Sequence, residues 1–263
     1  MGHFFDSDTE VTPGADGIYN AEITDRWTGL HGRPLGSYGL AVGMRALARQ
    51  MPHSDPLSVS AYFLRPIEVG PAETRTELVR KGRRMSFGQV TLSQGGEEKL
   101  RAVAAFADLP DLDGPASSFG DAPQLPPPDE CVDPLADLAM PGITLLDRVE
   151  YRTTEVPGWL RGEPGTSPTR DFWMRLRDGR EPDPPALTFL WDAMSPMVLE
   201  IGRAPSTTLE AAIHIRRRPA PGWLACRAAT RHITGSLCEE DMGIWDSTGN
   251  LVAQSRQLTL LTP

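Results

Sequence analysis

The chain has 263 residues, a formal net charge of −9, a sequence pI near 5.1 and 40% hydrophobic residues. This length and composition predict a globular protein with a substantial core, and the acidic balance disfavours nucleic acid as a partner. There is no run of about 18 apolar residues, so we expect no membrane partner. The 3 cysteines form no CxxC pair and the N-terminal sequence resembles no secretion signal, so we expect a cytoplasmic protein with reduced thiols.

The first half of the sequence predicts one helix and a series of strands. Leu40, Met44 and Leu47 recur at helical spacing within residues 36–50. Alternate residues of the next segment, Leu57–Leu64, are apolar, as in a half-buried strand, and Pro66 ends this strand because proline cannot donate to a ladder. The other strands that we expect here span residues 17–27, 73–79, 85–93 and 100–106.

A connector rich in proline and aspartate, residues 108–142, separates this half from a second half with the same order of elements. A possible strand at 143–153 precedes a helix at 185–195, which Pro196 should end or kink. The alternating segment Leu209–Ile215 then leads to Pro219, as Leu57–Leu64 leads to Pro66. Three further strands are expected at 223–231, 236–245 and 251–261.

This repeat predicts an α+β fold built from two copies of a helix that packs on an antiparallel sheet. We place the N-terminal unit at residues 1–110, the connector at 111–141 and the C-terminal unit at 142–263. The two sheets could join edge to edge, because pairing protects their free edges.

Several short segments carry a resemblance to a known family. They are Tyr62–Pro66, Val79–Phe87, Leu187–Asp192, Thr208–His214 and Leu251–Gln257. In order and spacing they resemble the double-hotdog type II acyl-CoA thioesterases, over most of the chain except the connector. The resemblance implies a tandem hotdog in which two antiparallel sheets each wrap a central helix. It also implies acyl-CoA as the substrate, no cofactor and no metal, and we expect a homo-oligomer.

In that family an Asp, a Thr and a Gln of the second hotdog bind the attacking water, and the matching residues here are Asp192, Thr208 and Gln257. A carboxylate can act as general base, while a hydroxyl and an amide can orient the same water. Alternative interpretations are a solvated helix residue for Asp192, an ordinary strand residue for Thr208 and an exposed end-strand amide for Gln257. Asp192 interrupts an apolar segment, however, where a charge requires a reason.

Four further residues are candidate substrate-binding groups. His31 and Gly32 precede the first helix in a glycine-rich segment, although an exposed turn is the alternative interpretation. His214 and Arg216 lie in or just after the strand that contains Thr208. Arg216 belongs to a run of arginines that could meet the phosphates of coenzyme A, as could Lys81, Arg83 and Arg84, or it could be solvated.

Two other functions remain open. A hotdog-fold enoyl-CoA hydratase would need a histidine a few residues after its Asp, and none follows Asp192 closely. A non-catalytic acyl-CoA-binding protein would have no need of three water-binding groups. The first half offers Ala104 at the same distance from Pro66 as Gln257 from Pro219, so we expect the chemistry to reside in the second half alone.

Overall fold

The computed structural model of the protein describes residues 2–112, 114–136, 138 and 140–261. Its helices are α1 (Phe4–Asp8), α2 (Gly36–Ala48) and α3 (Pro184–Leu190). The strands of the first half are β1 (Thr12–Pro13), β2 (Ile18–Ile23), β3 (Asp55–Phe63), β4 (Gly70–Lys81), β5 (Ser86–Gln94) and β6 (Glu97–Ala107). Those of the second half are β7 (Val149–Arg152), β8 (Thr169–Leu176), β9 (Ser206–Ile215), β10 (Leu224–Ala229), β11 (Ile233–Thr234), β12 (Leu237–Trp245) and β13 (Leu251–Leu261).

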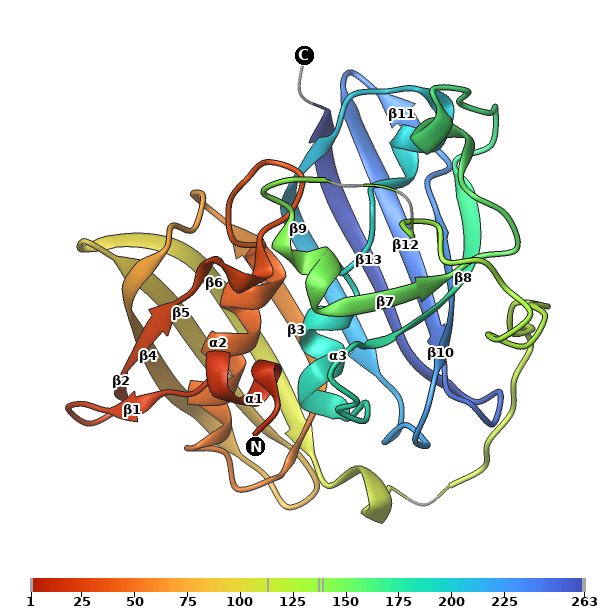
Figure 1. The fold of residues 1–263 in the computed structure, drawn as a ribbon. Coiled ribbons are helices and arrows are strands. Elements are labelled where there is room, and N and C mark those ends of the chain that lie inside the picture. The colour runs from red at the N-terminus through yellow and green to blue at the C-terminus, as the bar shows by residue number, and fades with distance from the viewer. Residues whose placement is uncertain (1, 113, 137, 139, 262–263) are drawn as a thin grey trace.

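The described strands form one 13-stranded sheet in the order β1-β2-β4-β5-β6-β3-β9-β13-β12-β10-β8-β7, with β11 paired to β12. Strands β3 and β9 join the halves antiparallel, from the pair Ser58 and His214 to the pair Tyr62 and Glu210. The two predicted sheets are joined edge to edge into a single sheet, because β3 and β9 pair through their backbones. Figure 1 shows this sheet curving around α2 and α3, which lie side by side in its centre.

Most predicted elements are found within a few residues, and two differences bear on the site. The second helix was expected to reach residue 195, but α3 is only 7 residues long and ends at Leu190. The chain then turns, with the indole N–H of Trp191 donating to the Thr188 carbonyl at 2.8 Å. Strand β8 was not predicted, although Phe172, Met174 and Leu176 alternate on its buried face.

Part of the connector packs against the second half instead of being exposed throughout. The Trp173 indole N–H donates to the Pro126 carbonyl at 2.8 Å, and Val132 N–H donates to the Thr153 carbonyl at 2.9 Å. Figure 1 shows the connector crossing from the end of β6 to the far side of the second half. Three residues of the predicted connector, numbers 113, 137 and 139, lie outside the described residues.

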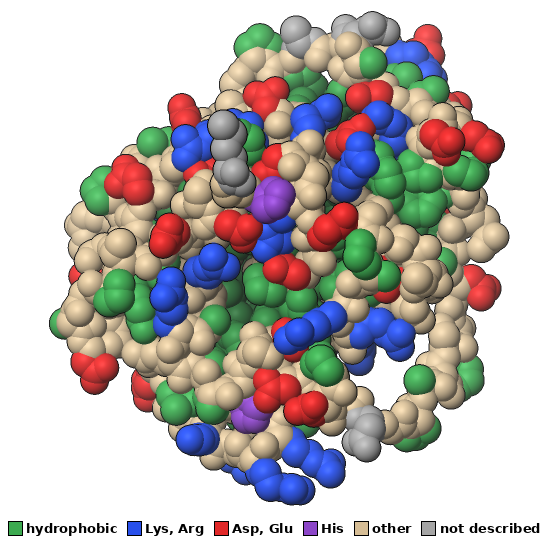
Figure 2. Space-filling view, turned by 60° about the horizontal axis from the view of Figure 1, so that its bottom comes forward, with side chains coloured by type: hydrophobic (Ala, Val, Ile, Leu, Met, Phe, Trp, Pro, Cys, Tyr) green, Lys and Arg blue, Asp and Glu red, His purple; other side chains and the backbone are tan. Residues whose placement is uncertain are grey.

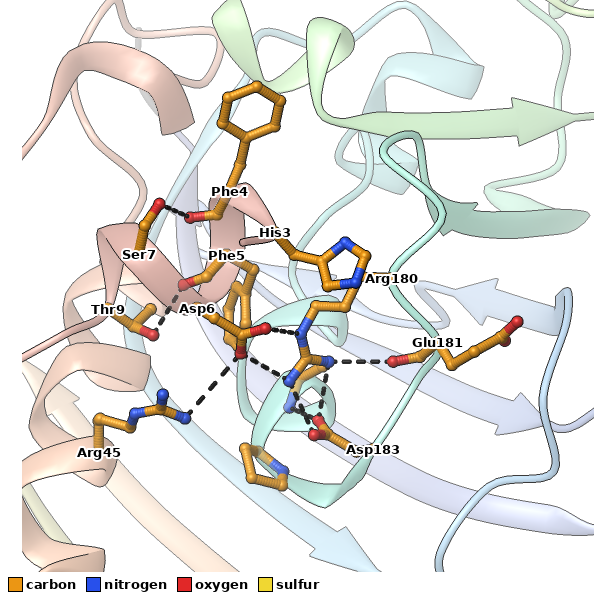
Figure 3. A network of polar contacts seen from close by, with 12 residues as sticks. His3, Phe4, Phe5, Asp6, Ser7, Thr9, Arg45, Arg180, Glu181 and Asp183 are labelled. Carbon is orange, nitrogen blue, oxygen red and sulfur yellow. Dashed lines mark hydrogen bonds and ion pairs between the residues drawn. The ribbon is translucent and has the colours of Figure 1, made fainter. Parts of the chain in front are cut away.

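An arginine-centred network fixes the start of α3. Arg180 donates to Asp6 of α1 at 2.9 and 3.0 Å and to Asp183 at 2.7 and 3.0 Å. Asp183 is the N-cap of α3 and accepts the Ala186 N–H at 2.8 Å. Arg45 of α2 approaches Asp6 from the other side, as Figure 3 shows. The network thus ties all three helices together and sets the position of α3.

Candidate active site

A cavity of about 660 Å³ lies between the two halves. Its walls are mostly apolar and come from the first half, the connector and the second half; examples are Leu35, Phe63, Leu135, Phe172 and Met197. Asp192, Thr208, Gln257 and Glu240 also line it. An apolar cavity with a few convergent polar groups is typical of a site for a small organic ligand.

Asp192 lies in the turn after α3 and faces the first turn of α2. Desolvation by burial raises the pKa of its carboxyl from 3.8 to about 6, while the backbone N–H of Ser37 and the amide of Gln257 act to lower this pKa. Helix α2 begins after Leu35, which provides no side-chain cap. The Asp192 carboxylate faces this end of the helix, where the helix N-terminus favours negative charge. Tyr151 steadies the turn by donating to the Ala193 carbonyl at 2.7 Å.

Thr208 and Gln257 come from the neighbouring strands β9 and β13. A register shift between Leu258 and Thr259 pairs Thr259 with Thr208 and leaves Leu209 as an extra residue. This bulge turns the Thr208 side chain toward the same face of the sheet as Gln257. The Thr208 hydroxyl donates to Oε1 of Gln257 at 2.6 Å, and Gln257 is only 4% exposed. The structure thus brings Asp192, Thr208 and Gln257 to one wall of the cavity.

Glu240 is a fourth polar group on this wall, which the sequence analysis did not single out. It lies on β12 opposite Gln257 and accepts the Gln257 Nε2–H on Oε1 at 2.8 Å. Desolvation by burial raises the pKa of Glu240 from 4.5 to about 7, and the nearby charge of Asp192 acts in the same direction. The sequence did contain a signal. Glu240, Met242 and Ile244 are alternate residues of one strand and share its buried face, where an apolar side chain is expected instead of a charged one.

The four candidate substrate-binding residues lie in different places. His31 lines the cavity and its Nε2 lies 3.2 Å from the Ser206 carbonyl, at the start of β9. Gly32 has a left-handed φ of 68° in the same turn but is not among the residues that line the cavity. His214 and Arg216 lie outside it: His214 lines a separate depression on the sheet, and Arg216 donates to Gln254 at 3.0 Å. Strand alternation explains this, because Ala211, Ile213 and Ile215 point inward and the residues between them point outward.

The corresponding positions of the first half are filled by packing. Gly88 pairs with Ala104 across β5 and β6, as Glu240 pairs with Gln257 across β12 and β13. A Cβ atom on Gly88 would lie 2.8 Å from Leu47 and 2.6 Å from Met51. Side chains of the longer helix α2 and its following turn thus occupy space that the shorter α3 leaves open in the second half.

On the face that Figure 2 shows, Lys and Arg side chains are interspersed with Asp and Glu side chains. Two of the arginines that line the cavity, Arg33 and Arg65, belong to the first half and were not singled out from sequence; Lys81, Arg83 and Arg84 do not line it. Within the described ranges, no helix is long and apolar enough to cross a bilayer. No group of three or more His, Cys, Asp or Glu side chains among these residues is placed to hold a metal ion.

Two protein-family models match this chain. The model of the acyl-CoA thioesterase N-terminal domain matches residues 23–107, and that of the acyl-CoA thioesterase C-terminal domain matches residues 128–261. An uncharacterized protein of Mycobacterium tuberculosis is 29% identical over 271 residues, which cover 93% of this chain and 91% of the relative.

Solved structures share the fold over nearly the whole chain. A protein from Thermobifida fusca assigned as a thioesterase II superposes with a TM-score of 0.88 and 29% identity, covering 99% of this chain and 98% of that chain. A protein of unknown function with a hot dog fold, from Alicyclobacillus acidocaldarius, superposes with a TM-score of 0.88 and 21% identity, covering 100% and 99%. The predicted hotdog fold and α+β class are therefore confirmed, and the two predicted sheets are continuous in the single sheet described above.

Proposed function

Because this chain belongs to the acyl-CoA thioesterase family, we propose that it hydrolyses acyl-CoA thioesters to the free acid and coenzyme A. The observation that carries the proposal is the convergence of Asp192, Thr208 and Gln257 on one wall of an apolar cavity of about 660 Å³. The apolar walls suit an acyl chain, and the polar wall suits the reacting thioester.

In the proposed reaction, Asp192 accepts a proton from a water molecule as the water oxygen attacks the thioester carbon. The resulting tetrahedral oxyanion collapses, the C–S bond breaks, and the leaving coenzyme A thiolate takes from Asp192 the proton that came from the water. A pKa of about 6 leaves Asp192 mostly ionised at pH 7, and this pKa is close to the working pH, where a general base is most effective. Such a base typically contributes about 10²–10⁴ in rate.

The first turn of α2 is our candidate for stabilising the oxyanion. Gly36 lines the cavity at the start of this 13-residue helix, and the first N–H groups of a helix have no partner within it. Backbone N–H groups and the helix dipole both favour a developing negative charge. In this proposal the first half supplies part of the site, although the water-binding groups lie in the second half.

The phosphates of coenzyme A require cationic groups near the cavity. Arg33 and Arg65 fit this role better than Arg216, because they line the cavity. Arg33 pairs with Glu68 at 3.2 Å and both side chains are exposed, so this pair can exchange for a phosphate at little cost.

The test is thiol release from a panel of acyl-CoA esters of increasing chain length, measured with and without a chelator. We expect release with at least one ester in both conditions, and Asp192→Asn should lower kcat by about 10² or more. Hydration of an enoyl-CoA without thiol release would favour the hydratase, and saturable binding without turnover would favour a binding protein. Activity that a chelator abolishes and a divalent ion restores would contradict the mechanism.

A further inference from the structure

Glu240 makes two hydrogen bonds that together occupy both oxygens of its carboxylate. Oε2 accepts the backbone N–H of Met197 at 2.6 Å, and Oε1 accepts the Nε2–H of Gln257 at 2.8 Å. Glu240 is 5% exposed, so water does not compete freely for these oxygens. A buried carboxylate on a strand is expensive unless both oxygens are satisfied and the charge has a use.

We infer that Glu240 is a positioning residue that fixes the direction of the hydrogen bonds around the attacking water. This inference rests on the proposed hydrolase function. An ionised carboxylate only accepts, so Gln257 must turn its NH₂ group to Glu240 and its Oε1 to Thr208. The Thr208 hydroxyl then donates to Gln257, at 2.6 Å, and its oxygen can only accept from a ligand.

This direction determines how a water molecule is held. The Thr208 oxygen and the Asp192 carboxylate both accept, so a water between them donates one proton to each. The two lone pairs of the water oxygen then point away from both residues, and one of them is free to attack a carbonyl carbon. Gln257 lies next to Asp192 as well, where its amide acts to lower the Asp192 pKa.

Because the backbone N–H of Met197 is fixed, replacing one oxygen of Glu240 by an NH₂ group should reverse the hydrogen bonds that follow it. A glutamine at position 240 must turn its carbonyl oxygen to Met197, because a main-chain N–H cannot reverse. Its NH₂ group then faces Gln257, which must flip its own amide and donate to Thr208. The hydroxyl proton of Thr208 becomes free to donate to the water, which occupies one of the two lone pairs of the water oxygen and turns the water away from its attacking orientation.

The first measurement is steady-state thiol release at pH 8 by Glu240→Gln, with Glu239→Gln on the same strand as the control. Glu239 does not line the cavity. We expect Glu240→Gln to lower kcat by about 10-fold to 100-fold, as for one misdirected hydrogen bond to the reacting group, with KM changed less than about 2-fold. The control should match the wild type, and both variants should show wild-type circular dichroism.

A double-mutant comparison separates this role from a purely structural one. In a Thr208→Val background no hydroxyl remains to be misdirected, so adding Glu240→Gln should lower kcat by a much smaller factor than it does in the wild type. In a Thr208→Ser background the hydroxyl is retained, and adding Glu240→Gln should lower kcat as much as in the wild type. If Glu240→Gln lowers kcat by the same factor in the Thr208→Val background as in the wild type, the inference is overturned. An unchanged kcat in the single variant Glu240→Gln would also overturn it.

A second measurement needs no substitution of Glu240. The ratio of wild-type kcat to Thr208→Val kcat, followed from pH 9 to pH 6, should fall on the acid side as Glu240 gains a proton and can donate to Gln257. Asp192 faces Glu240 and Cys238 lies along its strand, but both are present in the two proteins, so their titration cancels in the ratio. Arg170, also at the cavity, is paired with Glu200 in both proteins.

A ratio that does not change between pH 9 and pH 6 would refute the inference. The failure of the proposed function looks different. In that case the wild-type protein itself releases no thiol from any acyl-CoA, whereas a failure of the positioning role leaves an active wild type and an equally active Glu240→Gln variant.

Discussion

Asp192→Asn should make the protein more stable at alkaline pH while it removes activity. Burial raises the pKa of Asp192 from 3.8 to about 6, so the folded state favours the protonated carboxyl. Stability from a raised carboxyl pKa is fully present below the unfolded pKa and is lost as pH rises through the folded pKa. Asparagine is uncharged at every pH and avoids this loss.

The magnitude follows from the pKa difference. A shift of about two units corresponds to roughly 3 kcal/mol at pH 8, because each unit is worth about 1.4 kcal/mol. By the same relation, the stability lost through Asp192 is less than about 1 kcal/mol at pH 4, because the carboxyl is still protonated in the folded state at that pH. Asparagine offers one acceptor oxygen instead of two toward Ser37 and Gln257, so the gain at pH 8 should be about 1–3 kcal/mol.

Urea unfolding of wild type and Asp192→Asn at pH 8 and pH 4 measures this difference. Asp16→Asn is the control, because Asp16 is an exposed turn residue whose replacement should change the free energy of unfolding by less than about 0.5 kcal/mol. The kcat of Asp192→Asn should fall by about 10² or more in the same preparations. The reasoning would be refuted if Asp192→Asn were less stable than the wild type at pH 8. It would also be refuted if the free energy of unfolding changed by the same amount at pH 8 and at pH 4.

Three further predictions concern the rest of the chain. His31→Ala should mainly change KM, because His31 lines the cavity but is not one of the water-binding groups; an equal fall of kcat, as in Asp192→Asn, would show shared chemistry. Chymotrypsin should first cut after the fully exposed Phe119, with the halves still co-eluting on gel filtration; a first cut inside β3–β6 or β9–β13 would contradict our division of the chain. Arg180→Ala should lower the free energy of unfolding by about 1–2 kcal/mol in a urea titration, because Asp6 and Asp183 lose their hydrogen bonds from its guanidinium group; no change would contradict this.

The sequence alone was enough to predict the repeated order of elements. Periodicity is local, so the alternation in Leu57–Leu64 and the spacing of Leu40, Met44 and Leu47 indicated a strand and a helix directly. Prolines marked the strand ends for the same reason. The resemblance predicted that Asp192, Thr208 and Gln257 belong to one site, although their spacing along the chain gives no measure of their distance in space.

Only the tertiary structure decided which side chains meet in the cavity. A bulge in the pairing of β9 and β13 turns Thr208 inward, and plain alternation sends His214 outward from the same strand. The contact of Asp192 with the first turn of α2 joins residues from the two halves of the chain. The role of Glu240 depends on the direction in which Met197 N–H points, a property of backbone packing that no residue type encodes. Such contacts depend on how distant segments pack together, and local sequence patterns do not specify that packing.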